Sequence, residues 1–241
     1  MAERRNPWSG RRTGHAPDFE AFVAGAAGRL LHTATLLTAE PPDHNPRARA
    51  LLTAALAHTY AVGDRLRDED PYERARRDLA ARFARGTPRH RAGRGGVLAR
   101  LTRQERLVVV LRLYEGVAEE QAAALLGLSE ARVRAVCARS VAVLREAAGP
   151  APAPGGRRAN RPGDREAAVR RLLETPHPPV PAGLAARAAE RGARLARRRR
   201  TAGRLLGTLG ALAAVAFLVW ASTARPWETP PAETTPVFEE W

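Results

Sequence analysis

Residues 101–146 read LTRQERLVVVLRLYEGVAEEQAAALLGLSEARVRAVCARSVAVLRE, and this stretch decides the fold of the most informative part of the chain. Apolar residues recur in it at the i, i+3, i+4 spacing of a helix face, which predicts three helices. Their expected bounds are Arg103–Glu115, Glu119–Leu126 and Glu130–Glu146. Thr102 precedes the first helix and is followed three residues later by a glutamate, which is the pattern of a capping box.

A three-residue turn is expected between the second and third of these helices. Gly127 can adopt the left-handed conformation that ends a helix, Leu128 can enter the core, and Ser129 can cap the next helix. Val133 and Leu144 lie on the apolar face of the third helix. Together these features predict a helix-turn-helix. In such a motif the helix before the turn, here Glu119–Leu126, braces the helix after it, here Glu130–Glu146, which enters the major groove of DNA.

The other face of the third helix carries arginines, among them Arg132, Arg134 and Arg139. A guanidinium group can bond to guanine with two hydrogen bonds or hold a phosphate, so this residue type suits a DNA-facing surface. The alternative is an ordinary helical hairpin with solvated arginines. The cap, the buried leucine and the arginine face occur together, and this combination favours DNA-binding ancestry.

Leu101–Gly116 and Ala122–Arg134 resemble region 4 of the extracytoplasmic-function sigma factors of the sigma-70 family. Phe19–Val23 and Leu30–Thr38 resemble the first helices of region 2 in an actinobacterial branch of that family. The resemblance implies that the helix starting at Glu130 recognises the −35 promoter element. Carried over by position, the residues that meet DNA are Ser129, Arg132, Arg134 and Arg139. Those that hold the motif are Gly127, Leu128, Val133 and Leu144.

The region 2 resemblance departs from the family where that family docks on RNA polymerase. In the stretch at 48–56, Arg49 and Ala50 stand where acids are expected, and Thr53 stands where glutamine is expected. Reversing a charge at a desolvated docking site weakens the binding of the partner by several kcal/mol. Core RNA polymerase is therefore expected as a partner through a degraded docking motif.

The composition favours an anionic partner. The chain has 241 residues, with 40 basic residues that are all arginine against 25 acidic ones, and a net charge of +15. Nucleic acid and an anionic lipid surface both fit this surplus. A single cysteine excludes a disulfide scaffold, and the six histidines lack metal-ligand spacing. We expect no catalytic residues, no metal, no cofactor and no enzymatic activity.

The most apolar stretch lies at residues 205–224, where no charge falls between Arg204 and Arg225. A helix of this length spans ~30 Å, which matches the hydrocarbon core of a membrane. The stretch predicts a single transmembrane helix with membrane lipid as a partner; the alternative is a buried core helix. Its basic juxtamembrane residues are Arg197, Arg198, Arg199, Arg200 and Arg204. The positive-inside rule then places the N-terminal domains in the cytoplasm and the C-terminal tail outside the plasma (inner) membrane.

The predicted fold is all-α, with two small helical domains, a flexible linker and one transmembrane helix. The expected parts are a disordered N-terminus (1–17), a region 2-like domain (18–85), a basic linker (86–96), the helix-turn-helix domain (97–147), a Pro/Ala/Gly-rich tether (148–181), a basic juxtamembrane helix (182–204), the transmembrane helix (205–224) and an acidic tail (225–241). The predicted function is that of a membrane-tethered, sigma-70-like transcription factor. The alternatives are a degenerate sigma-like membrane protein that binds a protein regulator or a polymerase component rather than DNA, and a basic membrane-surface anchor.

Overall fold

The computed structural model describes residues 15–63, 69–86, 95–148, 162–174 and 177–224, without the side chains of 15, 16, 148, 162, 202–204, 206, 223 and 224. The helices are α1 (His15–Thr38), α2 (Pro46–Val62), α3 (Pro71–Arg85), α4 (Arg103–Val109), η2 (Val110–Tyr114), α5 (Glu119–Leu126), α6 (Glu130–Ala148), α7 (Pro162–Leu173) and α8 (Leu184–Ala224). As the sequence predicts, the described residues contain no strand. The chain divides into two units, residues 1–196 and residues 197–241.

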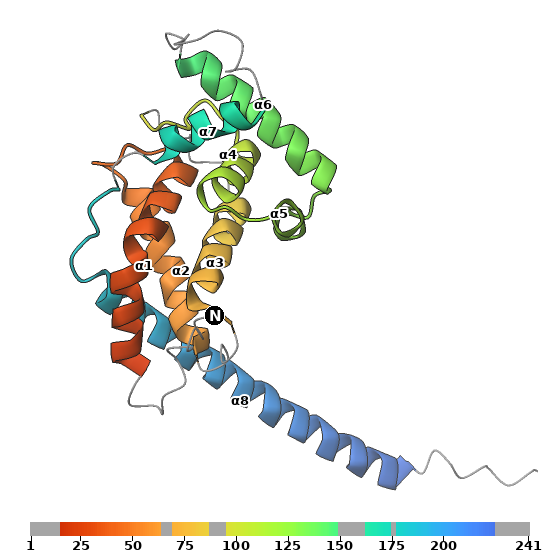
Figure 1. Ribbon diagram of the computed structural model, residues 1–241. Helices are drawn as coiled ribbons and strands as arrows, with labels where there is room; N and C mark the ends of the chain where they lie inside the picture. The colour runs from red at the N-terminus through yellow and green to blue at the C-terminus, as the bar shows by residue number, and fades with distance from the viewer. Residues whose placement is uncertain (1–14, 64–68, 87–94, 149–161, 175–176, 225–241) are drawn as a thin grey trace, which may run out of the picture. The chain divides into compact units, whose positions relative to one another are not determined.

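The first three helices lie side by side and bury their apolar faces against one another (Figure 1). Local signals start two of them. Pro46 occupies the first turn of α2, and the Asp70 side chain accepts a hydrogen bond of 2.9 Å from the backbone N–H of Tyr72 at the start of α3. The large side chains buried between the three helices include Phe19, Leu30, Leu52, Leu56 and Leu79.

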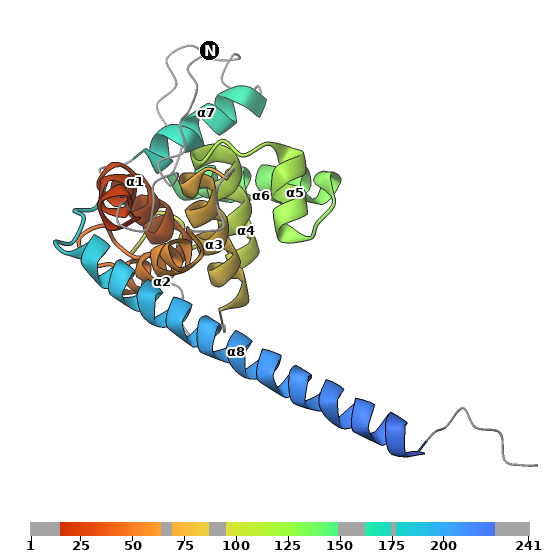
Figure 2. The same ribbon diagram turned by 90° about the horizontal axis from the view of Figure 1, so that it is seen from below.

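These three helices share one hydrophobic core with the helices of the 101–146 stretch, whereas two small domains were expected. Figure 2 shows α4 beside α3. Buried Leu98 and Leu111 join the same core as Leu52. In addition, Arg106 Nη1 donates a buried hydrogen bond of 2.7 Å to the carbonyl oxygen of Leu37 in α1. Small helical domains bury only a modest fraction of their surface, so packing the two together removes more apolar area from water.

The chain beyond α6 also contributes to this unit. Of the linker expected at 148–181, residues 149–161 and 175–176 lie outside the described residues, and residues 162–173 form α7, which buries Val169 and Leu173.

The first turns of α8 bury Leu184 and Ala188 and lie against α2 (Figure 2). A Cβ atom at Gly192 would fall 2.5 Å from the carbonyl oxygen of Ala57 and 2.8 Å from the Tyr60 side chain, so only glycine allows this approach.

The rest of α8 lies in the second unit, where large apolar side chains are exposed. Among the residues that the structure describes, no helix is long and apolar enough to cross a membrane. The prediction of a transmembrane helix at 205–224 is therefore wrong, and the plasma-membrane localisation that rested on it is not supported. The exposed apolar side chains are Leu205, Leu209, Leu212, Val215, Phe217, Leu218, Val219 and Trp220.

Three other predicted parts fall largely or wholly on residues that the structure does not describe. Most of the N-terminus expected to be disordered (1–17) and most of the basic linker (86–96) lie outside the described residues. The acidic tail (225–241) lies outside them entirely.

Candidate nucleic-acid interface

The helix-turn-helix stretch begins at the capping box that the sequence predicts. The backbone N–H of Thr102 donates to Glu105 Oε2 at 2.8 Å, and the backbone N–H of Glu105 donates to Thr102 Oγ1 at 3.4 Å. The hydrogen bond from the Thr102 backbone is the main cause that lowers the pKa of the Glu105 carboxyl group. The ionised carboxylate therefore satisfies the N-terminus of α4 at neutral pH.

The first expected helix, Arg103–Glu115, changes its hydrogen-bond pattern partway along. α4 passes into the π-helical turn η2, where the backbone N–H of Glu115 donates to the carbonyl oxygen of Val110 at 2.9 Å. Gly116, with φ of 71°, then ends the helical segment. The side chain of Glu115 is completely buried.

The Glu115 carboxylate holds the end of η2 to α1 and α3. The Thr33 hydroxyl donates to Oε1, and the Tyr72 hydroxyl donates to Oε2 at 2.9 Å. Arg29 Nε and Arg76 Nη1 lie 3.6 and 4.0 Å from Oε2. Burial and, after it, the charge of Glu115 raise the pKa of Tyr72, so this hydroxyl remains a donor. The helix-turn-helix is thus attached to the first three helices by buried polar contacts as well as by the core.

The turn between α5 and α6 has the predicted geometry. Gly127 is left-handed, with φ of 66° and ψ of 35°. The backbone N–H of half-buried Leu128 donates to the carbonyl oxygen of Ala123 at 3.0 Å. Ser129 Oγ accepts a hydrogen bond of 3.2 Å from the backbone N–H of Arg132. Ser129 therefore caps α6 and fixes where the arginine-bearing helix begins.

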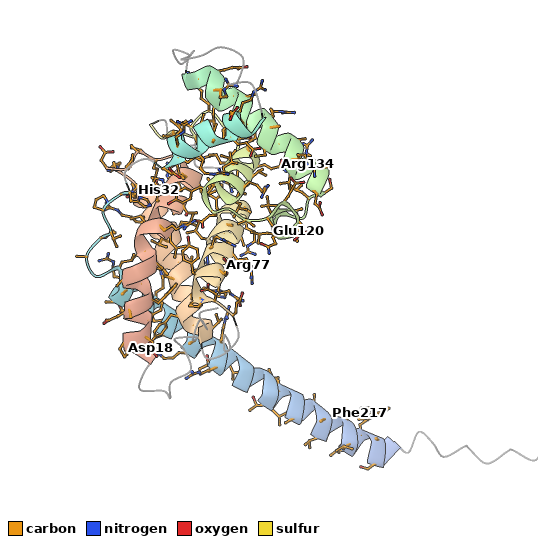
Figure 3. The ribbon with its side chains drawn as sticks, viewed as in Figure 1. Asp18, His32, Arg77, Glu120, Arg134 and Phe217 are labelled. Carbon is orange, nitrogen blue, oxygen red and sulfur yellow. The ribbon has the colours of Figure 1, made fainter. Side chains whose placement is uncertain are left out.

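α6 has two chemically distinct faces. The apolar side chains of its buried face are Val133, Val136, Cys137, Val141 and Leu144. Burial raises the pKa of the Cys137 thiol to about 11, so the group is a protonated core residue. The other face leaves Arg132, Arg134 and Arg139 exposed. Figure 3 shows Arg134 on this helix.

Acidic side chains of the same motif lie near two of these arginines. Arg134 Nη2 donates to Glu119 Oε1 at 2.5 Å. The charge of Arg139 contributes to lowering the pKa of Glu105. From sequence, Glu119 is only a first-turn residue favoured by the helix dipole. No spacing rule could have paired it with Arg134, because the two lie on different helices whose crossing is set by the turn.

A cluster of rings joins α1 to the segment after α7. The His32 ring lies 4.9 Å from that of Tyr114 and 4.7 Å from that of His177, measured between centroids. His32 Nε2 donates to the carbonyl oxygen of Leu173 at 2.7 Å. Burial is the main cause that lowers the pKa of His32, which keeps the ring neutral. In the described part of the chain, no group of three or more His, Cys, Asp or Glu residues could hold a metal ion.

The basic residues predicted beside a membrane lie in the second unit. Arg197, Arg198, Arg199 and Arg200 are exposed on α8, and the side chain of Arg204 is outside those that the structure describes.

Residues 97–146 match the family described as Sigma-70, region 4. The matched residues contain α4, η2, α5 and nearly all of α6. Searches of curated proteins and of solved structures found no match. The region 4 family is a family of non-enzymatic transcription factor domains. This part of the chain is sigma-70-like, and the match indicates a DNA-binding, transcription-related role. The extracytoplasmic-function subtype and the region 2 resemblance stay predictions.

Proposed function

We propose that this protein is a sigma-70-like transcription regulator that binds promoter DNA through the N-terminal half of α6. The observation that carries the proposal is the two-faced character of α6, which buries an apolar face and exposes Arg132, Arg134 and Arg139. A face buried in the core holds the helix rigidly, and an arginine face on the other side suits base edges and phosphates. The family match over residues 97–146 supports the same role.

The dimensions and chemistry of α6 fit the major groove of DNA. A helix of ~10–12 Å diameter fills a groove ~12 Å wide. Ser129 lies at the N-terminus of α6, where exposed N–H groups and the helix dipole favour a phosphate. In the proposed complex, Arg132 and Arg134 lie against base edges in the first turns, and Arg139 reaches the backbone one to two turns later. The sequence read in this way is the −35 promoter element.

RNA polymerase is the second proposed partner, since sigma region 4 domains generally interact with DNA and RNA polymerase. The stretch of α2 that departs from the family has Arg49 and Thr53 half-buried, and the Thr53 hydroxyl donates to the carbonyl oxygen of Arg49 at 2.7 Å. We propose that these departures weaken the contact with core polymerase. The double variant Arg49→Glu/Thr53→Gln should bind purified core enzyme more tightly than the wild type. Unchanged binding would place the cause of weak docking elsewhere.

The test of DNA binding uses the full-length protein, kept in solution with a mild detergent because large apolar side chains of α8 are exposed. Selection from a random duplex library gives the preferred sequence, and fluorescence anisotropy at several salt concentrations gives affinity and salt slope. Arg132→Ala and Arg134→Ala should each reduce the preference for that sequence and lower the salt slope by up to about one. Arg187→Ala, which removes an exposed arginine from α8, is the matched control and should keep the preference.

Equal binding to all duplexes, with no effect of either α6 substitution, would contradict the proposal. A stable protein partner that both α6 variants retain, together with that result, would favour the regulator-binding alternative instead.

A further inference from the structure

Glu119 and Arg134 form a contact between the bracing helix and the helix proposed to read DNA. Glu119 is the first residue of α5, and Arg134 lies at the start of the second turn of α6. The distance between Arg134 Nη2 and Glu119 Oε1 is 2.5 Å. The Arg134 side chain is 69% exposed, whereas the Glu119 side chain is only 21% exposed. The carboxylate is therefore the sheltered partner, and the guanidinium group is the one that reaches solvent.

The geometry of a guanidinium group lets one side be held while another remains available. Arginine presents five N–H donors in a rigid plane, and the described contact uses a donor on Nη2. The other donors can still form the pair of hydrogen bonds that identifies guanine. Glu119 is itself well placed for this task, because the dipole of α5 favours a carboxylate in its first turn.

The three exposed arginines of α6 therefore differ in their surroundings. Arg134 is paired with Glu119, and Arg139 interacts electrostatically with Glu105. Among the described residues, the structure gives no ion pair for Arg132. A long side chain without a fixed partner loses more conformational entropy when it binds. Arg132 therefore loses more conformational entropy on contacting a base than Arg134, which is held in advance in one orientation.

We infer that Glu119 is a positioning residue, which orients the guanidinium group of Arg134 for a sequence-specific contact with a guanine base. The inference rests on the proposed function. It assigns sequence selectivity to a residue that does not itself touch DNA. Because preorganisation lowers the cost of a specific contact more than that of a loose phosphate contact, its loss should appear in selectivity before it appears in overall affinity.

The neighbouring residue supplies a matched control. Glu119→Gln and Glu120→Gln each remove one negative charge from the first turn of α5, and Glu120 is exposed. The structure gives the ion pair with Arg134 to Glu119. Figure 3 shows Glu120 at α5 and Arg134 on α6. Any effect of charge on attraction to DNA is common to both variants, so the difference between them reports the positioning of Arg134.

The experiment compares two duplexes with the full-length protein at several salt concentrations. The first is the selected sequence. The second has one G·C pair exchanged: the pair whose exchange weakens binding by the wild type but not binding by the Arg134→Ala variant. Glu119→Gln should reduce the ratio of the two affinities about three- to tenfold, while Glu120→Gln should leave it unchanged. Both variants should bind DNA of any sequence somewhat more tightly. In the Arg134→Ala background, Glu119→Gln should have no further effect on the ratio.

The possible outcomes separate this inference from the proposed function. If Glu119→Gln and Glu120→Gln give the same ratio while Arg134→Ala still loses the preference, the positioning role is wrong and the DNA-binding role stands. A ratio for Glu119→Gln above that of the wild type would also overturn the inference, because Glu119 would then be masking Arg134. A wild-type protein without any sequence preference would overturn the proposed function. Equal thermal midpoints of both glutamine variants would confirm that the comparison reports binding rather than folding.

Discussion

Two arginine-bearing helical segments, α6 and the first turns of α8 (residues 184–196), belong to the same unit but are held in it differently. α6 buries five apolar side chains on one face, including Val133 and Leu144. The first turns of α8 bury Leu184 and Ala188 and rely on the close approach of Gly192 to α2. Arginines are about as dense in residues 184–196, which hold three, as in α6, which holds four, yet α6 removes more apolar area from water. The density of arginines therefore does not indicate how firmly a helix is held.

The largest expected effect comes from weakening the buried face of α6. Leu144→Ala should lower the free energy of unfolding by about 2–5 kcal/mol, because it leaves a cavity beneath the helix. Urea denaturation measures this change. Ala142→Ser, at an exposed position on the same helix, is the control and should change stability little. If both variants unfolded at the same urea concentration, the firm anchoring of α6 would be contradicted.

A smaller effect is expected where α8 meets α2. Gly192→Leu places a Cβ atom 2.5 Å from the Ala57 carbonyl oxygen, and such overpacking costs about 1–3 kcal/mol. The first turns of α8 should separate from α2, so amide hydrogen exchange should quicken in residues 184–196. Gly207→Leu provides the control, since nothing lies within 4 Å of a Cβ atom at that glycine. Unchanged exchange in Gly192→Leu would show that α8 does not depend on this contact.

Replacing Gly127, in the turn before α6, by alanine should lower the free energy of unfolding moderately. Gly127→Ala forces a Cβ atom onto a residue with φ of 66°, which costs about 1–2 kcal/mol. Thermal unfolding measures the loss. Gly163→Ala, in the first turn of α7 where nothing lies within 4 Å, should leave stability unchanged or slightly raised. Equal midpoints for the two variants would mean that the left-handed turn does not limit the stability of α6.

The smallest expected effect concerns pH and the segment that leads from α7 to α8. Burial is the main cause that lowers the pKa of His32 below its value in the unfolded chain, and the nearby His177 acts in the same direction. As pH falls below about 6.5, the unfolded chain takes up the proton first, so the folded state loses stability. His32→Gln, which keeps a donor for the Leu173 carbonyl oxygen, should reduce this loss between pH 7 and pH 5.

Exposed His44 supplies the control for that measurement. His44→Gln should retain the pH dependence of the wild type in urea denaturation. Identical pH profiles for the wild type and His32→Gln would show that the contact between α1 and the chain after α7 does not respond to pH.

The sequence predicts those parts of the interface that depend on neighbours in the chain. The Thr102–Glu105 capping box, the left-handed Gly127 and the Ser129 cap all involve groups within a few residues of one another. The π-helical turn at Val110–Tyr114 has no comparable signal, because the buried partners of Glu115 come from α1 and α3. The pairing of Glu119 with Arg134 is absent from the prediction for the same reason: it spans two helices.

The predictions for the C-terminal part were less successful, since length and hydropathy describe a segment without its surroundings. The transmembrane helix expected at 205–224 is not supported among the described residues, and part of the linker expected at 148–181 is the packed helix α7. The sequence shows only a short amphipathic piece at Arg165–Glu174, and its Val169 and Leu173 are buried once α6 and η2 provide a surface.

The sequence by itself determined the all-helical class, the turn and caps of the helix-turn-helix, and the arginine face of α6, because backbone hydrogen bonds and helix periodicity act over a few residues. Only the tertiary structure decided that the first three helices share a core with the helix-turn-helix, that Gly192 lies against α2, and that Arg134 is paired while Arg139 interacts only at longer range. These contacts join residues far apart in the chain or on different helices. Their free energy depends on burial and charge separation, which exist only once the helices have packed together.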